Sequence, residues 1–225
     1  MQIKLISYTQ PTEELKELGV NNCQDLLAYC AKVSNPQNQM NLESSDRLIK
    51  YLIKHQHWSV FGMADATLEI ITTRDIARQI LRHSSFQFQE FSQRYADPAE
   101  MGNMFETREA RLQDTKNRQN SIIVDDENLQ NQWTAAQQDV IDLAKEAYDW
   151  AIANGIAKEQ ARAVLPEGNT ISKLYMKGSI RSWIHYCSLR AGNGTQLEHM
   201  LIAKAAADTL CSIIPDFKSF CNLEQ

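Results

Sequence analysis

The sequence predicts a single α+β domain over residues 1–225. Three observations lead to this prediction. Strand-like patterns occur near the N-terminus, whereas helical patterns dominate after residue 130. No internal repeat or low-complexity linker divides the chain. A chain of 225 residues with 43% hydrophobic content is also long and apolar enough to bury a substantial core.

The first 73 residues contain two predicted strands with a helix between them. Residues 2–7 form the first strand. The second alternates with Ala66, Leu68 and Ile70 on one face and ends at Thr72-Thr73. The segment after Ser45 predicts a helix whose apolar side is formed by Leu48, Tyr51 and Leu52.

Thr73 is the expected N-cap of the next helix, in which Ile76, Ala77 and Ile80 face the interior. This helix carries Gln79, and Arg82 and His83 follow it by three and four residues. Side chains at these spacings share one face of a helix. The three polar groups are therefore expected to lie together.

The second half of the chain is predicted to be helical. Residues 96–130 are polar and predict a long loop with a short element. An amphipathic helix follows from Trp133 to about Ala153 and ends at Gly155. Its apolar positions are Val140, Leu143, Ala144, Ala147 and Ala151. Further helices are expected from about Ala157 to Leu165, before Pro166; from Thr170 to Leu189, as one helix or two short ones; and from Gln196 to Ile214, before Pro215.

The composition excludes several classes of function. The 23 basic and 28 acidic residues give a net charge of −5, which disfavours nucleic-acid binding through a basic surface. No signal peptide and no apolar run long enough to span a membrane is apparent. The five cysteines have no close pairs and indicate reduced thiols in a cytoplasmic protein. His55 and His57 lack the companions that a metal site needs, so no metal is expected.

The most informative segment spans residues 82–95, Arg-His-Ser-Ser-Phe-Gln-Phe-Gln-Glu-Phe-Ser-Gln-Arg-Tyr. It combines two arginines with a histidine, an acid, serines, glutamines and four aromatic rings. Guanidinium groups bind anionic oxygens through planar pairs of donors, so phosphate is the natural ligand. The alternative is a solvated segment between a helix and a loop, with His83 a buried histidine satisfied by protein partners.

Three further arginines, Arg162, Arg181 and Arg190, lie among apolar residues. An unpaired buried charge is costly, so each of them needs an anionic or carbonyl partner. Salt bridges to the protein's own acids are the simplest alternative to a ligand. After Arg190, the run Gly192-Asn193-Gly194-Thr195 predicts a tight turn whose free N–H groups can meet a phosphate or a carbonyl. Its spacing is not that of a dinucleotide-binding fingerprint.

These residues resemble the flavin-dependent thymidylate synthase family. Its signature is Arg-His-Arg, seven residues, then Ser-x-Arg, and Arg82-His83-Ser84 with Ser92-Gln93-Arg94 fits that spacing with one substitution. Further blocks resemble the family in order along the whole chain: residues 57–61, 74–82, 108–114, 161–166 and 181–196. The resemblance implies an N-terminal mixed or antiparallel sheet packed against helices, with long C-terminal helices.

The resemblance also implies an activity, namely methylation of dUMP at C5 to give dTMP. Methylenetetrahydrofolate donates the carbon, reduced FAD supplies the hydride, and NADPH reduces the flavin. The family is a homotetramer whose active sites combine residues of neighbouring subunits. The implied catalytic residue is Arg190, which lies near the uracil and favours its N3-deprotonated form.

Two sets of binding residues follow from the resemblance. The implied dUMP contacts are Gln79, Arg82, Glu90, Ser92, Arg94, Arg162 and Arg190. The implied FAD contacts are Ser59, Arg82, His83, Ser85, Gln89, Glu90, Arg181 and His185. The alternative for His185, Trp183 and Tyr186 is packing at an interface between subunits.

Five positions depart from the family pattern: Val60 replaces a proline, Gln87 and Gln89 stand where Ser and Asn are common, and the other two lie at the implied FAD pocket. Ser84 replaces the second signature arginine, and Gly62 replaces a glutamate near the flavin. Both changes remove polar groups from the implied FAD pocket, while the implied nucleotide contacts are all present. Two alternative functions therefore remain: an enzyme that modifies C5 of another pyrimidine nucleotide, such as UMP, and a nucleotide-binding protein without catalysis.

Overall fold

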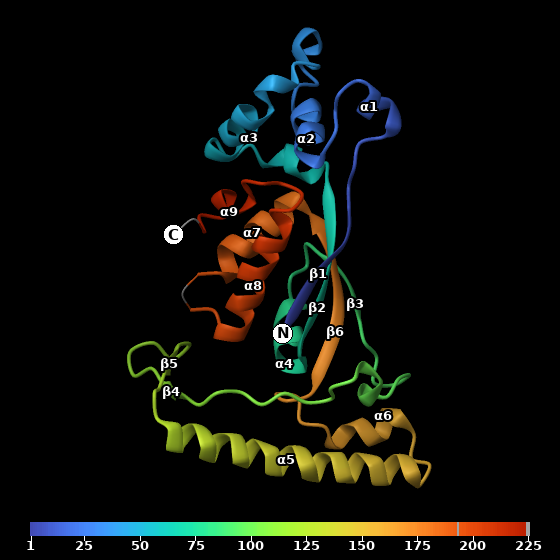
Figure 1. Ribbon diagram of the computed structural model, residues 1–225, viewed down its shortest axis with the longest axis vertical. Helices are drawn as coiled ribbons and strands as arrows, with labels where there is room; N and C mark the ends of the chain where they lie inside the picture. Colours follow the sequence, from blue (N-terminus) through green and yellow to red (C-terminus); the bar gives the residue numbers. More distant parts are fainter. Residues whose placement is uncertain (193, 224–225) are drawn as a thin grey trace.

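The computed structural model describes residues 1–192 and 194–223 and is built on a four-stranded antiparallel sheet. Figure 1 shows the long sheet with α7 and α8 on one face, which confirms the α+β prediction. The strand order is β1 (Gln2–Tyr8), β2 (Asp65–Thr73), β6 (Ile171–Ser179) and β3 (Gln87–Glu90). β3 is therefore an edge strand and β6 a central one.

The predicted alternation in β2 is present. Ala66, Leu68 and Ile70 are fully buried, while the residues between them are partly exposed. The other face of the sheet is more polar, and there the Tyr175 hydroxyl donates to Glu69 Oε2 at 2.9 Å. One apolar face and one polar face is the usual pattern of an antiparallel sheet.

The prediction of helix from Thr170 to Leu189 was wrong for its first half, which is β6. Leu174 and Met176 are fully buried, whereas Lys177 and Tyr175 point to the exposed face. This period of two is a strand signal, but it is hidden in a segment that continues directly into a helix. The second half is α7 (Ile180–Arg190), as expected.

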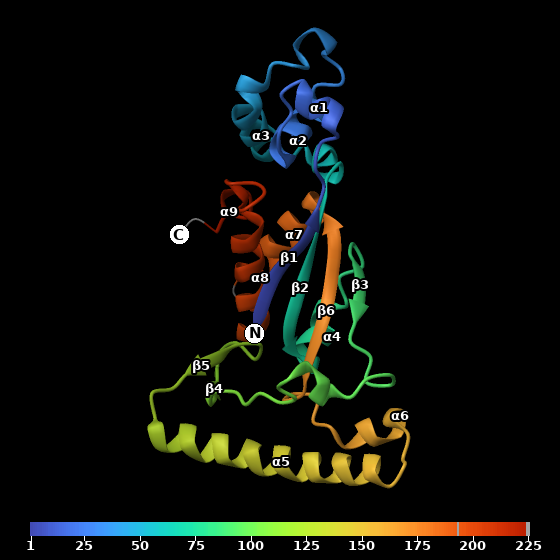
Figure 2. The same ribbon diagram turned by 45° about the vertical axis from the view of Figure 1, so that its right-hand side comes forward.

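A group of helices lies at the end of the sheet opposite α5 (Figure 2). The predicted helix after Ser45 is α3, but its buried residues are Ile49 and Leu52, whereas Tyr51 is exposed. The elements of this group are α1 (Glu13–Glu17), α2 (Cys23–Ala31), η1 (Pro36–Asn38), η2 (Leu42–Ser44), α3 (Ser45–Lys54) and η3 (Trp58–Gly62).

The predicted helix after Thr73 is α4 (Arg74–Ile80), and Ile76, Ala77 and Ile80 are buried as expected. Thr73 is the N-cap residue, although its hydroxyl does not bond the helix backbone. It donates to Asp75 Oδ1 at 2.7 Å instead. The helix ends at Ile80, so Arg82 and His83 lie in the following turn and not on a common helical face with Gln79.

Residues 96–130 form a long loop that contains η4 (Pro98–Met101) and a small hairpin of β4 (Arg111–Gln113) and β5 (Ser121–Ile123). The next helix, α5 (Glu127–Ala153), begins before the predicted Trp133. Asp126 caps it by accepting a hydrogen bond from the Leu129 backbone N–H at 3.0 Å. Gly155 follows its end with φ +76°, as the C-terminal signal predicted.

The apolar positions predicted for α5 fall on two faces. Ala144 and Ala151 are buried, but Val140 and Leu143 are 53% and 68% exposed. The buried side also contains Ile141 and Tyr148, which the sequence pattern did not single out. In Figures 1 and 2, α5 lies across one end of the sheet and its outer side carries no other element.

The remaining helices agree approximately with the predictions. The segment from Ala157 to Leu165 is a short helix followed by a 3₁₀ turn, and the last predicted helix ends before Ile214. These elements are α6 (Lys158–Ala161), η5 (Arg162–Val164), α8 (Leu197–Leu210) and α9 (Phe217–Phe220). All five cysteines are free thiols.

Within residues 1–192 and 194–223, no helix has the length and apolar character that crossing a bilayer requires. The same residues contain no cluster of three or more His, Cys, Asp or Glu side chains placed to hold a metal ion.

Gly178 of β6 lies directly against the Phe86 ring of the segment 82–95. A Cβ atom there would lie 2.4 Å from Cδ1 of Phe86, whose ring is buried against Trp183 at 4.8 Å. We expect Gly178→Ala to destabilise the fold by about 1–3 kcal/mol, because the ring has no free space to move into. Urea unfolding of the variant would measure this. Gly62→Ala is the control, since a Cβ at Gly62 has no atom within 4 Å; equal stability of the two variants would contradict the account.

Candidate active site

The segment 82–95 forms a turn, the edge strand β3 and a second turn. Arg82, Ser84 and Ser85 are exposed in the first turn, while the Phe86 ring anchors it in the core. The segment is therefore ordered by packing and still presents its polar side chains to solvent. This corrects the alternative of a simply solvated segment.

His83 forms a hydrogen bond with Arg190, the last residue of α7. Arg190 Nε donates to His83 Nε2 at 3.0 Å, so His83 carries its own proton on Nδ1. Burial, followed by the charges of Arg190 and Arg82, lowers the pKa of His83 and keeps it neutral. No hydrogen bond of the terminal Arg190 nitrogens to a described residue is present, so they can bind a ligand.

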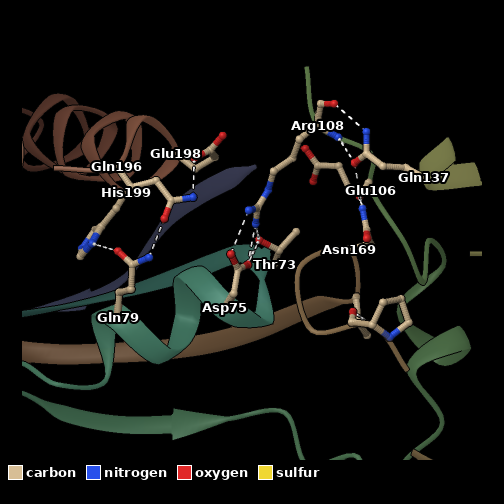
Figure 3. Close-up of polar contacts among 12 residues, drawn as sticks. Thr73, Asp75, Gln79, Glu106, Arg108, Gln137, Asn169, Gln196, Glu198 and His199 are labelled. Carbon is tan, nitrogen blue, oxygen red and sulfur yellow. Dashed lines mark hydrogen bonds and ion pairs between the residues drawn. The ribbon is translucent and has the colours of Figure 1, made fainter. Parts of the chain in front are cut away.

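Gln79 belongs to a network that joins α4 to α8 (Figure 3). Its amide Nε2 donates to Gln196 Oε1 at 2.7 Å, and its Oε1 lies 3.3 Å from His199 Nδ1. Gln196 Nε2 in turn donates to Glu198 Oε2 at 2.9 Å. On the other side of the imidazole, His199 Nε2 lies 3.1 Å from the Tyr186 hydroxyl.

A second group of predicted residues lies around β3 and α6. Glu90 is held by Ser172 Oγ, which donates to it at 2.9 Å, and its oxygens lie 3.6 Å from Arg74 and from Arg78. Arg94 forms an ion pair with Glu159 at 3.4 Å. Arg162 Nε donates to the Glu159 backbone carbonyl at 3.3 Å, so Arg94 and Arg162 are neighbours.

A third group lies at the start of α7. Arg181 and His185 are exposed and one helical turn apart. The His185 ring packs on Trp58 of η3 at 4.7 Å, next to Ser59. The Ser85 backbone carbonyl accepts from Ser182 Oγ at 3.3 Å. Ser59 also lines a cavity of about 670 Å³ between η3 and α2.

Packing alone explains part of the aromatic content here. Trp183 and Tyr186 are buried, and Trp183 Nε1 donates to the Ala66 carbonyl at 3.1 Å, which joins α7 to β2. These two residues therefore pack in the core of the single chain and not at an interface between subunits. His185, by contrast, is exposed.

The predicted residues therefore form three groups within one chain: Gln79, His83 and Arg190; Glu90, Arg94 and Arg162; and Ser59, Ser85, Arg181 and His185. Among the described residues, no hydrogen bond or ion pair joins one of these groups to another. Arg94 has a local carboxylate partner, whereas Arg82, Arg162, Arg181 and Arg190 form no ion pair within the described chain. Four of the five arginines thus lack the salt bridge that was their simplest alternative explanation. Gln89 lies beside Glu90 on β3, and Ser92 lies two residues beyond the end of this strand.

The predicted turn after Arg190 is present in part. Gly194 has φ +89°, a conformation that favours glycine, and α8 begins soon after it. Asn193 lies outside the described residues.

Some residues of the site were not predicted. Arg108 binds Asp75 through Nη1 at 2.9 Å and Nη2 at 2.5 Å (Figure 3). Gln137 of α5 bonds both backbone groups of Arg108 at 2.8–2.9 Å. Arg111 pairs with Glu198. The only sequence signal for these contacts was the block 108–114, whose partners are distant in sequence. His199, Gln196 and Glu198 were missed for the same reason.

Comparisons with known proteins establish the family of the chain. The family described as thymidylate synthase complementing protein (Thy1) matches residues 4–216. A flavin-dependent thymidylate synthase of Synechocystis sp. is 50% identical over 206 residues, 92% of each chain. A probable flavin-dependent thymidylate synthase of Paramecium bursaria Chlorella virus 1 is 47% identical over 215 residues, 96% of each chain.

A solved structure has the same fold. It is described as the UMP/dUMP methylase PolB from Streptomyces cacaoi bound with 5-Br dUMP, and it aligns with a TM-score of 0.79 at 22% identity. The alignment covers 98% of this chain and 94% of that one. With the family match and the two relatives, the conclusion is that this chain belongs to the Thy1 family of flavin-dependent thymidylate synthases.

Proposed function

We propose that the protein is an FAD-dependent thymidylate synthase of the cytoplasm that methylates dUMP at C5 to give dTMP. Methylenetetrahydrofolate is the carbon donor, and NADPH is the reductant. The observation that carries the proposal is a set of four arginines that form no ion pair within the described chain: Arg82 of the signature, and Arg162, Arg181 and Arg190 of the other family-like blocks. The relatives that are about half identical over nearly the full chain support it.

The nucleotide is bound by residues of the first and second groups. Arg94 and Arg162 are neighbours and suit a phosphate, together with Arg82 and Ser92. The Arg94–Glu159 pair is about half exposed, so it is weak and a dianionic phosphate can displace it. Gln79, Glu90 and Arg190 complete the site. The free Arg190 nitrogens stabilise negative charge on the uracil, which makes C5 a better nucleophile.

The third group fits FAD. Ser59, Ser85, Arg181 and His185, with His83, Gln89 and Glu90, would hold it, and Arg82 lies where both ligands meet. The exposed Arg181 guanidinium has no ion pair within the described chain and suits the flavin's pyrophosphate. Bound FAD supplies the hydride that completes the new methyl group. The role of the protein is to orient and polarise the reactants.

A homotetramer with shared sites explains why the groups are separate within one chain. The outer face of α5 supports self-association, because two series of apolar residues repeat there every seven positions, as in a coiled coil. The first series is Trp133, Val140 and Ala147, and the second is Ala136, Leu143 and Trp150. Val140, Leu143 and Trp150 are 53%, 68% and 62% exposed. A contiguous apolar face of this kind normally contacts another protein surface. We call these two series the seam of α5, and a second copy of the chain presents the same seam for packing.

Leu143→Glu should break this seam. A carboxylate buried in an apolar helix contact costs several kcal/mol, so the variant should elute as a smaller species and lose activity that depends on shared sites. Light scattering after gel filtration would measure the mass. Gln138→Glu adds the same charge to the exposed side of α5 outside the seam and should leave the mass unchanged. An unchanged mass for Leu143→Glu would exclude the seam as an interface.

The function itself is tested by tritium release from 5-tritiated dUMP in the presence of FAD, methylenetetrahydrofolate and NADPH. The proposal predicts tritium release together with dTMP formation. Well-folded, FAD-loaded protein that releases no tritium would contradict it.

A second candidate is methylation of C5 in UMP. It is favoured by the fold match to a protein described as a UMP/dUMP methylase and by the changed residues at the flavin pocket. A panel of UMP, dUMP and dCMP, with products identified by mass spectrometry, separates the candidates. Conversion of dUMP alone excludes the second one.

The third candidate, a nucleotide-binding protein without catalysis, follows from Ser84 and Gly62. Ser84 is exposed and Gly62 has open space around its Cβ position, so larger side chains fit at both sites. Ser84→Arg and Gly62→Glu should each raise FAD affinity about tenfold, the value of one charge-assisted hydrogen bond. Flavin absorbance during FAD titration measures this. If neither change affects affinity, these positions do not contact the cofactor.

A further inference from the structure

The hydrogen bonds around Gln79 form a chain with one fixed direction. Glu198 sets this direction because an ionised carboxylate accepts hydrogen bonds and donates none. Its Oε1 pairs with Arg111, and its Oε2 accepts from Gln196 Nε2 at 2.9 Å. Gln196 must therefore present its carbonyl oxygen to Gln79, which donates Nε2–H to it at 2.7 Å.

The hydrogen-bond directions on the other side of Gln79 are determined in the same way. Its Oε1 can only accept, so the partner at 3.3 Å, His199 Nδ1, must carry a proton. His199 Nε2 then accepts from the Tyr186 hydroxyl at 3.1 Å. Each donor in the chain is thus determined by the acceptor before it, starting from the carboxylate.

The surroundings of His199 hold it in this tautomer. The ring is fully buried, and Tyr186 is 2% exposed. Burial, followed by the charges of Arg190, His83 and Arg82, lowers the pKa of His199 to about 3, so the neutral ring carries one proton. Burial raises the pKa of Tyr186, which therefore remains a phenol that can donate.

We propose that His199 is a positioning residue for the nucleotide site: with Tyr186, it fixes the Gln79 amide so that Gln79 offers the nucleotide an N–H donor. One Nε2 hydrogen is used by Gln196, and the second is free. Gln79 is half-buried at the end of α4, so this hydrogen can reach a ligand. Its partner is an acceptor atom of a pyrimidine nucleotide, a carbonyl or a sugar oxygen. This inference rests on the proposed function.

Two variants of His199 test the donor. His199→Leu removes the donor to Gln79 Oε1, so the Gln79 amide is held by Gln196 alone and is less firmly oriented, and dUMP affinity should fall about tenfold, the effect of one hydrogen bond. His199→Asn places an N–H near the position of Nδ1 and should bind dUMP more tightly than His199→Leu. Calorimetric titration of FAD-loaded protein with dUMP measures both. FAD uptake and thermal melting report whether the fold is intact, and His55→Leu, a change at an exposed histidine of the helix end, is the control.

The tautomer is tested separately. Long-range ¹H–¹⁵N spectra of the imidazole rings should show the Nδ1–H form for the signal that His199→Asn removes. An Nε2–H form, or equal affinity of the Leu and Asn variants for dUMP, would overturn the proposal. If the wild-type protein binds no dUMP, the proposed function fails and the nucleotide part of this inference fails with it. The tautomer result remains interpretable in that case.

Discussion

Arg190→Ala should lower kcat for dTMP formation about 10²–10³-fold, the usual effect of removing one donor from a site that stabilises developing charge. Arg190 Nε is already bonded to His83, so the guanidinium is held in place and its terminal nitrogens face a ligand without reorganisation. Tritium release from 5-tritiated dUMP measures the change. FAD content should remain at the wild-type level, because Arg190 is not among the residues that we place on the flavin.

Arg190→Lys provides a stricter comparison. Lysine keeps the charge but lacks the planar set of donors, so it should recover only part of the lost rate. Arg47→Ala, at an exposed arginine of α3, is the matched control and should behave as wild type. If Arg190→Ala retains wild-type kcat, Arg190 does not act on the uracil.

Subunits that carry Arg190→Ala and Arg94→Ala should each be inactive alone and active when mixed. The first variant retains the Arg94–Arg162 group, and the second retains the Gln79–Arg190 group. If each site takes one group from each of two subunits, random mixing leaves about one site in four intact in a closed oligomer. Co-expression with two different tags, followed by activity assay of the doubly purified protein, measures this fraction.

The control mixture combines Arg94→Ala with Arg162→Ala. Both changes fall in the same group, so every mixed site contains a defect and no activity should return. Recovery in the control, or no recovery in the test mixture, would show that the two groups do not come from different subunits.

The local elements of the fold were predictable from sequence because their signals are local. The alternation of β2, the Thr73 boundary of α4 and the Gly155 stop after α5 all appear as expected. The strand β6 was missed because its period of two lies between helical patterns, and its central place in the sheet depends on pairing with β2 and β3. The sequence did not distinguish the inner and outer faces of α5, because both carry apolar residues. Only the structure shows that Ala144 is buried and Leu143 is exposed.

The candidate residues could be named from the sequence, but their grouping could not. The signature spacing selected Arg82, Ser92 and Arg94. Within the described part of the chain, Arg82, Arg162, Arg181 and Arg190 form no ion pair and are available to a ligand. The network through His199 could not be predicted, because the hydrogen bonds of Gln79 to Gln196 and to His199 join residues that are 117 and 120 positions apart in sequence. The proposed sharing of sites between subunits would explain why the groups are separate within one chain.

The most direct test is an experimental structure of the protein with FAD and dUMP bound. The account predicts that one dUMP contacts Arg190 of one subunit together with Arg94 and Arg162 of a neighbour, with the flavin beside Arg181 and His185. A dUMP molecule bound by residues of a single chain, or bound away from Arg190, would contradict it.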